Sequence, residues 1–129
     1  MAIARRISLY EREIRVHLGT AALEVLFQLA ETLSEGQRDG GKYFGSTMIT
    51  LDLERAGGLV REPCDAASAR RVAELLARDA RVQARARDLA TTAAVRRAGT
   101  PLGNLRVELR ARAAGPRVHV DVDVEGETP

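Results

Sequence analysis

The sequence predicts a two-layer α+β fold, in which helices pack on one face of a small, largely antiparallel sheet that ends in a C-terminal β-hairpin. Two patterns predict it. Apolar residues return every three or four positions over residues 21–35 and 66–98, which is typical of amphipathic helices. Apolar and charged residues alternate over residues 105–125, which is typical of strands with one buried face. We expect one domain over residues 1–125 and a disordered tail at 126–129.

The core is expected to be aliphatic, because aromatic residues make up only 3% of the sequence and tryptophan is absent. Apolar residues at 45% and charged residues at 29% are typical of a globular domain that needs neither metal nor disulfide to fold. All basic residues except Lys42 are arginine, a bias that indicates a GC-rich bacterial coding sequence.

The single cysteine, Cys64, excludes an internal disulfide and a multi-cysteine zinc site, and it favours a reducing compartment. No stretch approaches the roughly 18 apolar residues that cross a bilayer, and the first residues lack a signal-peptide pattern. We therefore expect a cytoplasmic protein that does not contact the membrane.

The N-terminal stretch, residues 5–18, fits two structures. Its apolar residues have helical spacing, while Ile14, Val16 and Leu18 also alternate with polar residues as in a strand. We favour the helix, and the strand stays open.

The middle of the chain is predicted as helix, loop and strand. Thr20 is expected to cap a helix over residues 21–35, and the glycine after it to end that helix. A glycine-rich, charged loop is expected over residues 36–45, followed by a half-buried strand over 48–54. A glycine pair then predicts a turn into a short strand at residues 59–60, which would form a hairpin.

The longest predicted element is a helix over residues 66–98. Asp65 or Ser68 is expected to cap it, and the Gly-Thr-Pro sequence at residues 99–101 to end it. The Ala-Thr-Thr sequence at residues 90–92 predicts a bend, because consecutive β-branched residues are mediocre helix formers.

Two registers of the C-terminal hairpin remain open. Pairing Ala111 with Val118 keeps the apolar residues on one face, but it sets Glu108 opposite Asp121. Shifting the pairing by two residues sets Arg110 opposite Asp121 instead. The alternation of residues fits both.

Residues 36–42 match most of the phosphate-binding P-loop motif. The next residue is Tyr43, where the motif needs a hydroxyl that ligates magnesium. The segment also joins a helix to a strand, whereas phosphate binding needs a strand before and a helix N-terminus after. We therefore expect a surface loop and no nucleotide site.

Cys64 is the one candidate nucleophile. A predicted helix N-terminus and nearby Arg61 both favour a reactive thiolate. Catalysis also needs a base, and neither His17 nor His119 belongs to a recognisable Cys/His motif. We expect a structural thiol, with a redox-sensitive thiol as the second interpretation.

A metal site is the weaker interpretation of the last strand. His119, Asp121 and Asp123 share a strand face, but strand residues two apart lie roughly 7 Å from one another. Arg106, Arg110 and Arg112 are expected on the same face as partners. We expect a solvated row of charges and no metal.

The excess of positive charge lies in the predicted helix 66–98. Some of this charge is paired at helical spacing with Glu74 and Asp88. No aromatic platform and no helix-turn-helix signature accompany the arginines, so an acidic protein partner is favoured over nucleic acid. The candidate contact residues are Arg70, Arg71, Arg78, Arg81, Arg85 and Arg87.

These observations favour a non-enzymatic protein-interaction or assembly module, oligomeric and with itself as the expected partner. We expect no cofactor and no catalytic residue. The alternative is a nucleic-acid-binding domain that uses the arginine-rich helix 66–98. A third hypothesis is an enzyme that uses Cys64, or a small-molecule binder at the loop 36–45.

Overall fold

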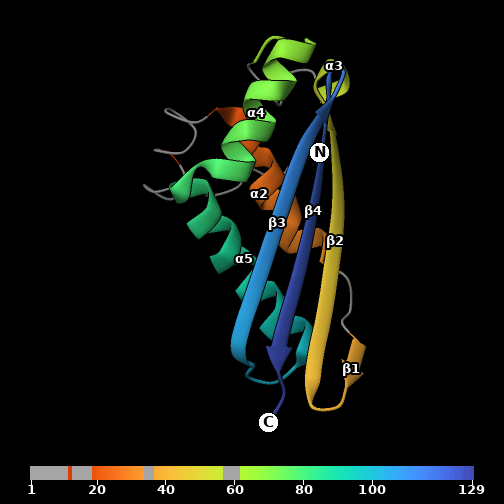
Figure 1. Cartoon of the computed structure of the whole chain (residues 1–129), viewed down its shortest axis with the longest axis vertical. Helices are drawn as coiled ribbons and strands as arrows, with labels where there is room; N and C mark the ends of the chain where they lie inside the picture. Colours follow the sequence, from red (N-terminus) through yellow and green to blue (C-terminus); the bar gives the residue numbers. More distant parts are fainter. Residues whose placement is uncertain (1–11, 13–18, 34–36, 57–61) are drawn as a thin grey trace, which may run out of the picture.

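The structure is a computed structural model that describes residue 12 and residues 19–33, 37–56 and 62–129. It has two layers, with helices on one face of a four-stranded antiparallel sheet of order β1-β2-β4-β3 (Figure 1). This confirms the predicted α+β fold. The elements are α2 (Thr20–Thr32), β1 (Gln37–Asp39), β2 (Lys42–Asp52), α3 (Leu53–Ala56), α4 (Ala66–Arg78), α5 (Ala80–Ala98), β3 (Gly103–Ala114) and β4 (Arg117–Glu127).

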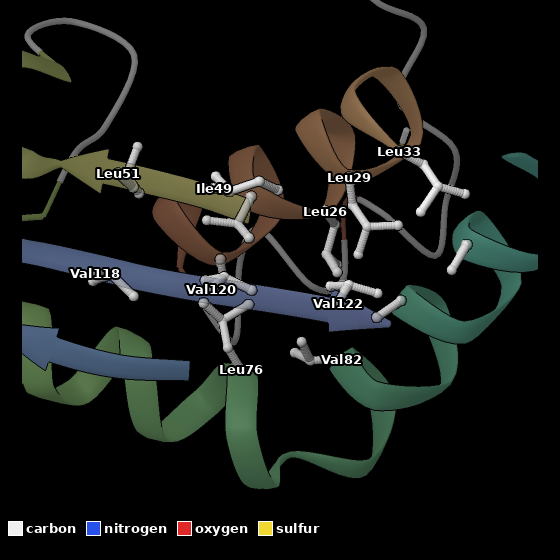
Figure 2. Close-up of a cluster of buried hydrophobic side chains, with 14 of the residues drawn as sticks. Leu26, Leu29, Leu33, Ile49, Leu51, Leu76, Val82, Val118, Val120 and Val122 are labelled. Atoms are coloured by element: carbon white, nitrogen blue, oxygen red, sulfur yellow. The ribbon is translucent and has the colours of Figure 1, made fainter. Parts of the chain in front are cut away.

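The core is aliphatic, as the composition predicts. Valines of β4 lie between β2 and β3 and point toward the helices, where leucines of α2 and α4 meet them (Figure 2). Alanines of α5 face α2, and their small side chains let the two helices approach closely. Residues at the centre of this cluster are Leu26, Leu29, Ile49, Leu76, Val82, Val118, Val120 and Val122.

The C-terminal hairpin adopts the shifted register, with Arg110 opposite Asp121. The turn decides it. In the observed register the two turn residues are Gly115 and Pro116, and Gly115 has a φ of 58°, which suits glycine at this position. The other register would place Pro116 inside the strand, where its missing N–H would cost a ladder hydrogen bond.

The predicted loop 36–45 is wrong over its described residues, because β1 and β2 form a hairpin there. Gly40 and Gly41 connect the strands with φ values of 58° and 78°. Two consecutive positive φ values are what a two-residue hairpin turn requires, and glycine adopts them without strain. Strand β2 therefore begins at Lys42, six residues before the predicted start, and ends at Asp52.

The single long helix predicted over 66–98 is also wrong, because it breaks at Asp79 into α4 and α5. Asp79 has an extended ψ of 124°, and its carboxylate accepts hydrogen bonds from the backbone N–H groups of Arg81 and Val82 at 2.9 and 3.2 Å. A side chain that caps a new helix competes with continuation of the old one. No break occurs at the predicted bend, since α5 continues through residues 90–92.

Helix α2 begins as predicted but is capped differently. The N-cap position is Gly19 rather than Thr20, and no side chain at the N-cap forms a hydrogen bond. The carboxylate of Glu62, forty-one residues along the chain, accepts from the N–H of Ala21 with both oxygens at 3.3 Å. Helix α4 is capped by Asp65, one of the two predicted residues, which accepts from the N–H of Ser68 at 2.8 Å.

Strand β4 continues through Glu127, and the N–H of Thr128 donates to the carbonyl of Gly41 at 2.8 Å. The predicted tail therefore begins too early, because Gly126 and Glu127 pair with β2.

The predictions for residues 5–18, except residue 12, and for a strand at 59–60 lie outside the described residues. Among the described helices, none combines the length and the apolar character that a membrane span needs.

Candidate interaction surface

The sheet has one face that the helices leave uncovered, which we call the open face (Figure 1). Three parallel rows of side chains cross it. The row on β2 is largely uncharged, the row on β4 is acidic, and the row on β3 is basic. The rows consist of Lys42, Phe44, Ser46, Met48 and Thr50 on β2, His119, Asp121, Asp123, Glu125 and Glu127 on β4, and Arg106, Glu108, Arg110 and Arg112 on β3.

Two large apolar side chains lie on the open face. Met48 is 82% exposed and Phe44 is 44% exposed, both on β2. Neighbouring residues of the same strand, such as Ile49 and Leu51, are buried on the opposite face. An apolar pair on the water-facing side of an alternating strand gains no stability from the core, so it is a candidate contact surface.

The centre of the open face is held by charged pairs. Arg110 lies between two carboxylates, with nitrogen-to-oxygen distances of 2.8 Å to Asp123 and 3.3 Å to Glu108. Near one end, Lys42 contacts Glu125 at 3.3 Å. Each of these pairs is solvent-exposed and contributes little stability, but together they fix the orientation of the side chains.

The basic row on β3 is only partly neutralised. Arg106 and Arg112 form no ion pair with any described residue, although Glu125 lies opposite Arg106. Glu125 instead contacts Lys42. Two guanidinium groups on the outermost long strand are thus left to solvent or to a partner.

Strand β3 also forms one edge of the sheet. No described strand pairs with its outer side, which we call the β3 edge. The opposite edge consists of the three-residue strand β1 and of residues 45–52 of β2, with which β1 does not pair. The apolar row of β3 is only partly buried, whereas the facing valines of β4 are fully buried; its members are Leu105, Val107, Leu109, Ala111 and Ala113.

The backbone of the β3 edge can be assigned from the turn. Because the turn has two residues, Ala114 and Arg117 on either side of it form a hydrogen-bonded pair. Such pairs alternate with positions whose N–H and C=O point to the other side. The even-numbered residues of β3 therefore bond to β4, and the odd-numbered residues direct their N–H and C=O groups to the β3 edge.

The candidate metal ligands on β4 have other contacts. His119 Nδ1 lies 3.1 Å from the hydroxyl of Thr50, and Asp123 contacts Arg110. Asp121 shares their face but belongs to no candidate group, since the described residues contain no cluster of three that could hold a metal ion. The three side chains form part of the row of charges on the open face.

Cys64 is exposed and immediately precedes Asp65, the cap of α4. The first turn of the helix is therefore served by the carboxylate of Asp65 and not by the thiol. Hydrogen bonds from the backbone and the hydroxyl of Ser68, followed by the charges of Arg70 and Arg71, hold the pKa of Asp65 below its ordinary value.

The candidate contact arginines are divided by the break at Asp79. Arg70, Arg71 and Arg78 lie on α4, and the rest lie on α5, all exposed except Arg85, which is partly buried. Arg78 contacts Glu74 at 3.6 Å, as its helical spacing predicts, and Arg81 contacts Asp79 at 3.7 Å. Arg70 and Arg71 form no ion pair with the described residues.

The P-loop resemblance has no structural counterpart in its described part. Gly40 and Gly41 form the β1–β2 turn, which leads into a strand and not into a helix. Lys42 points its amine to Glu125. The segment therefore lacks the helix N-terminus that would bind phosphate.

The sequence missed the two features that stand out here. The β3 edge could not be read from alternation, because alternation shows which face of a strand is buried and not which neighbour it has. The exposed apolar pair had one signal, since Met48 falls on the polar side of the predicted strand 48–54.

No protein-family model, no curated protein and no solved structure matches the chain.

Proposed function

We infer that the chain is a protein-interaction and assembly module that acts through the uncovered side of its sheet, with a second copy of itself as one partner. The observation that carries this proposal is the exposed apolar pair on the open face, Met48 and Phe44. Covering a methionine or phenylalanine side chain contributes about 1.5–3 kcal/mol, which exposed polar neighbours do not supply.

The charges of the open face support association between copies. An acidic row on β4 lies beside a basic row on β3, so the same face carries both signs. A self-complementary surface is what a two-fold dimer interface requires, because each patch meets its own copy. When two copies meet, their acidic and basic rows guide how the copies align more than they raise the affinity.

Self-association is tested by sedimentation velocity over a wide range of concentrations. We expect a concentration-dependent dimer for the native chain and a shift of at least about tenfold toward monomer for Met48→Asp, because a charge replaces the apolar contact. Ala84→Asp adds the same charge at an exposed position of α5 and should leave the equilibrium unchanged. A native chain that stays monomeric throughout would overturn the self-association.

Nucleic-acid binding is the second candidate, favoured by Arg70 and Arg71. Both are exposed on α4 and form no ion pair with the described residues. If these arginines bind phosphate, affinity falls steeply as salt rises, because bound counterions are released. A fluorescence titration of DNA and RNA at low and at moderate salt tests this, with Arg70→Glu as the variant that should lose binding.

A further inference from the structure

We propose that the β3 edge binds an extended segment of a partner protein in which apolar and acidic residues alternate, so that the segment adds a fifth strand to the sheet. The inference rests on the proposed interaction function but uses a different surface from the open-face contact. Three observations support it: free backbone groups, a partly exposed apolar row and a basic row without enough acidic partners.

The backbone of β3 is suited to strand addition. From Arg106 to Ala114 its pairing with β4 is regular, and the one register irregularity lies before Arg106. Over this length the odd-numbered residues direct N–H and C=O groups outward. Natural edges are commonly interrupted by proline, by bulges or by short strands, and this part of β3 has none of these.

The side chains of β3 specify the partner's two faces. Toward the helices, Val107 and Leu109 are partly buried, and an apolar side chain on a neighbouring strand would cover them further. Toward the open face, Arg106 and Arg112 have no ion pair among the described residues. An acidic residue directly opposite an arginine is favoured across neighbouring strands.

The chain itself contains a strand with this pattern. On the inner side of β3, strand β4 presents valines toward the helices and Asp121, Asp123 and Glu125 toward the open face. The charges on β3 therefore already select an acidic strand as a neighbour on one side. These side chains project from the open face and can reach a neighbouring strand on either side of β3, so an acidic strand is favoured on the outer side as well.

A second copy of β3 is a poorer occupant of the β3 edge. Each strand carries three arginines and one glutamate on its open-face side, so antiparallel self-pairing cannot give every arginine an acidic partner. With Leu109 at the centre, for example, Arg106 of each strand faces Arg112 of the other. A partner segment with acidic residues places opposite charges beside the arginines, and only Glu108 then meets a like charge.

The probe is a fluorescent synthetic peptide with the sequence of residues 118–127, titrated with the full chain and followed by anisotropy. We expect saturable binding, and about tenfold weaker binding by the double variant Arg106→Glu, Arg112→Glu. The double variant Arg70→Glu, Arg71→Glu makes the same change of charge on α4 and should bind as the native chain does. Equal losses in both variants would overturn the proposal, since they would indicate general charge attraction.

N-methylated peptides test the geometry of binding. In a strand added antiparallel to β3 at the β3 edge, the valine N–H groups point to β3 and the acidic residues' N–H groups point away. Methylation at the peptide positions of Val120 and Val122 should abolish binding, and methylation at those of Asp121 and Asp123 should not. Loss of binding with both peptides would indicate replacement of β4 and would overturn the proposal, as would equal binding of a peptide with lysines at the acidic positions.

The two proposals can fail separately. If the native chain dimerises through Met48 but no peptide binds, the open-face interaction stands and the β3 edge proposal is overturned. If the peptide binds with the expected preferences while the chain remains a monomer, only the self-association is lost. If Arg106→Glu changes the dimer equilibrium and Met48→Asp does not, the occupant of the β3 edge is a second copy and not an acidic segment.

Discussion

The guanidinium of Arg110 lies 2.8 Å from the carboxylate of Asp123 on the neighbouring strand. Asp123 is diagonal to Arg110, because the residue directly opposite Arg110 is Asp121. Directly opposite Asp123 is Glu108, which Arg110 also contacts, at 3.3 Å. The observed register of the hairpin therefore does not remove the like-charge pair that the other register contains. It moves that pair to Glu108 and Asp123, where one arginine, Arg110, contacts both carboxylates.

Replacing Arg110 tests this arrangement. Arg110→Met keeps the strand but leaves Glu108 opposite Asp123 with no cation between them, so we expect the free energy of unfolding to fall by about 0.5–1 kcal/mol. The value is small because the side chains of Arg110 and Asp123 are 58% and 53% exposed. Urea denaturation at low ionic strength measures it, and high salt should reduce the effect. Arg112→Met, on the same row without an ion pair to a described residue, should change stability by less than about 0.3 kcal/mol.

The contact between Glu62 and α2 predicts a larger effect. Glu62→Ala removes the only carboxylate that the described structure places on the N–H of Ala21, so we expect a loss of about 1 kcal/mol in the free energy of unfolding. Asp88→Asn, which neutralises an exposed carboxylate in the middle of α5, is the control. A Glu62 variant as stable as the control would contradict a capping role.

Asp65 predicts a dependence of stability on pH. Its pKa in the folded chain is lowered, first by the hydrogen bonds from Ser68 and then by Arg70 and Arg71, so its ionised form stabilises the fold. This contribution is fully present above the ordinary carboxyl pKa of about 4 and is lost as the pH falls through the lowered pKa. Asp65→Asn keeps a good helix cap without the charge. Urea denaturation should show the native chain more stable than this variant at pH 6, with the difference shrinking below about pH 4.

The β1–β2 turn predicts a penalty at Gly41. Its φ of 78° is unfavourable for residues with a Cβ, so Gly41→Ala should lower the free energy of unfolding by about 1 kcal/mol. Gly103→Ala is the control, since the φ of Gly103 is not positive and no atom lies within 4 Å of an added Cβ. Thermal unfolding of both variants distinguishes a defined turn from a loop, because a loop would tolerate both alanines equally.

Periodicity predicted the helices and strands where one face is strongly apolar. The layered fold and the buried valines of β4 followed from alternation over 105–125. The stripe of leucines predicted a helix over 21–35, which the structure contains as α2 but which ends at Thr32, earlier than predicted. Predictions failed where the pattern is short or interrupted. Residues 37–45 contain too few apolar positions to reveal a hairpin. The apolar stripe of 66–98 continues on both sides of Asp79, so it did not reveal that the side chain of Asp79 caps a new helix there.

The candidate surfaces divide in the same way. Alternation placed Asp121, Asp123 and the β3 arginines on one exposed face, and the structure contains that face. It also predicted Asp65 as a cap, which the hydrogen bond from Ser68 confirms. The capping of Ala21 by Glu62 joins residues forty-one positions apart, and no local pattern contains such a contact.

By itself the sequence determined which side of each strand meets the core, because burial of apolar side chains imposes a period of two that a register error of one residue would destroy. Only the tertiary structure decided which strands are neighbours, that β3 is an edge, and that Arg110 stands between Glu108 and Asp123. These are pairings between distant segments, and their free energy depends on turn geometry and on the order of strands, neither of which leaves a period in the sequence.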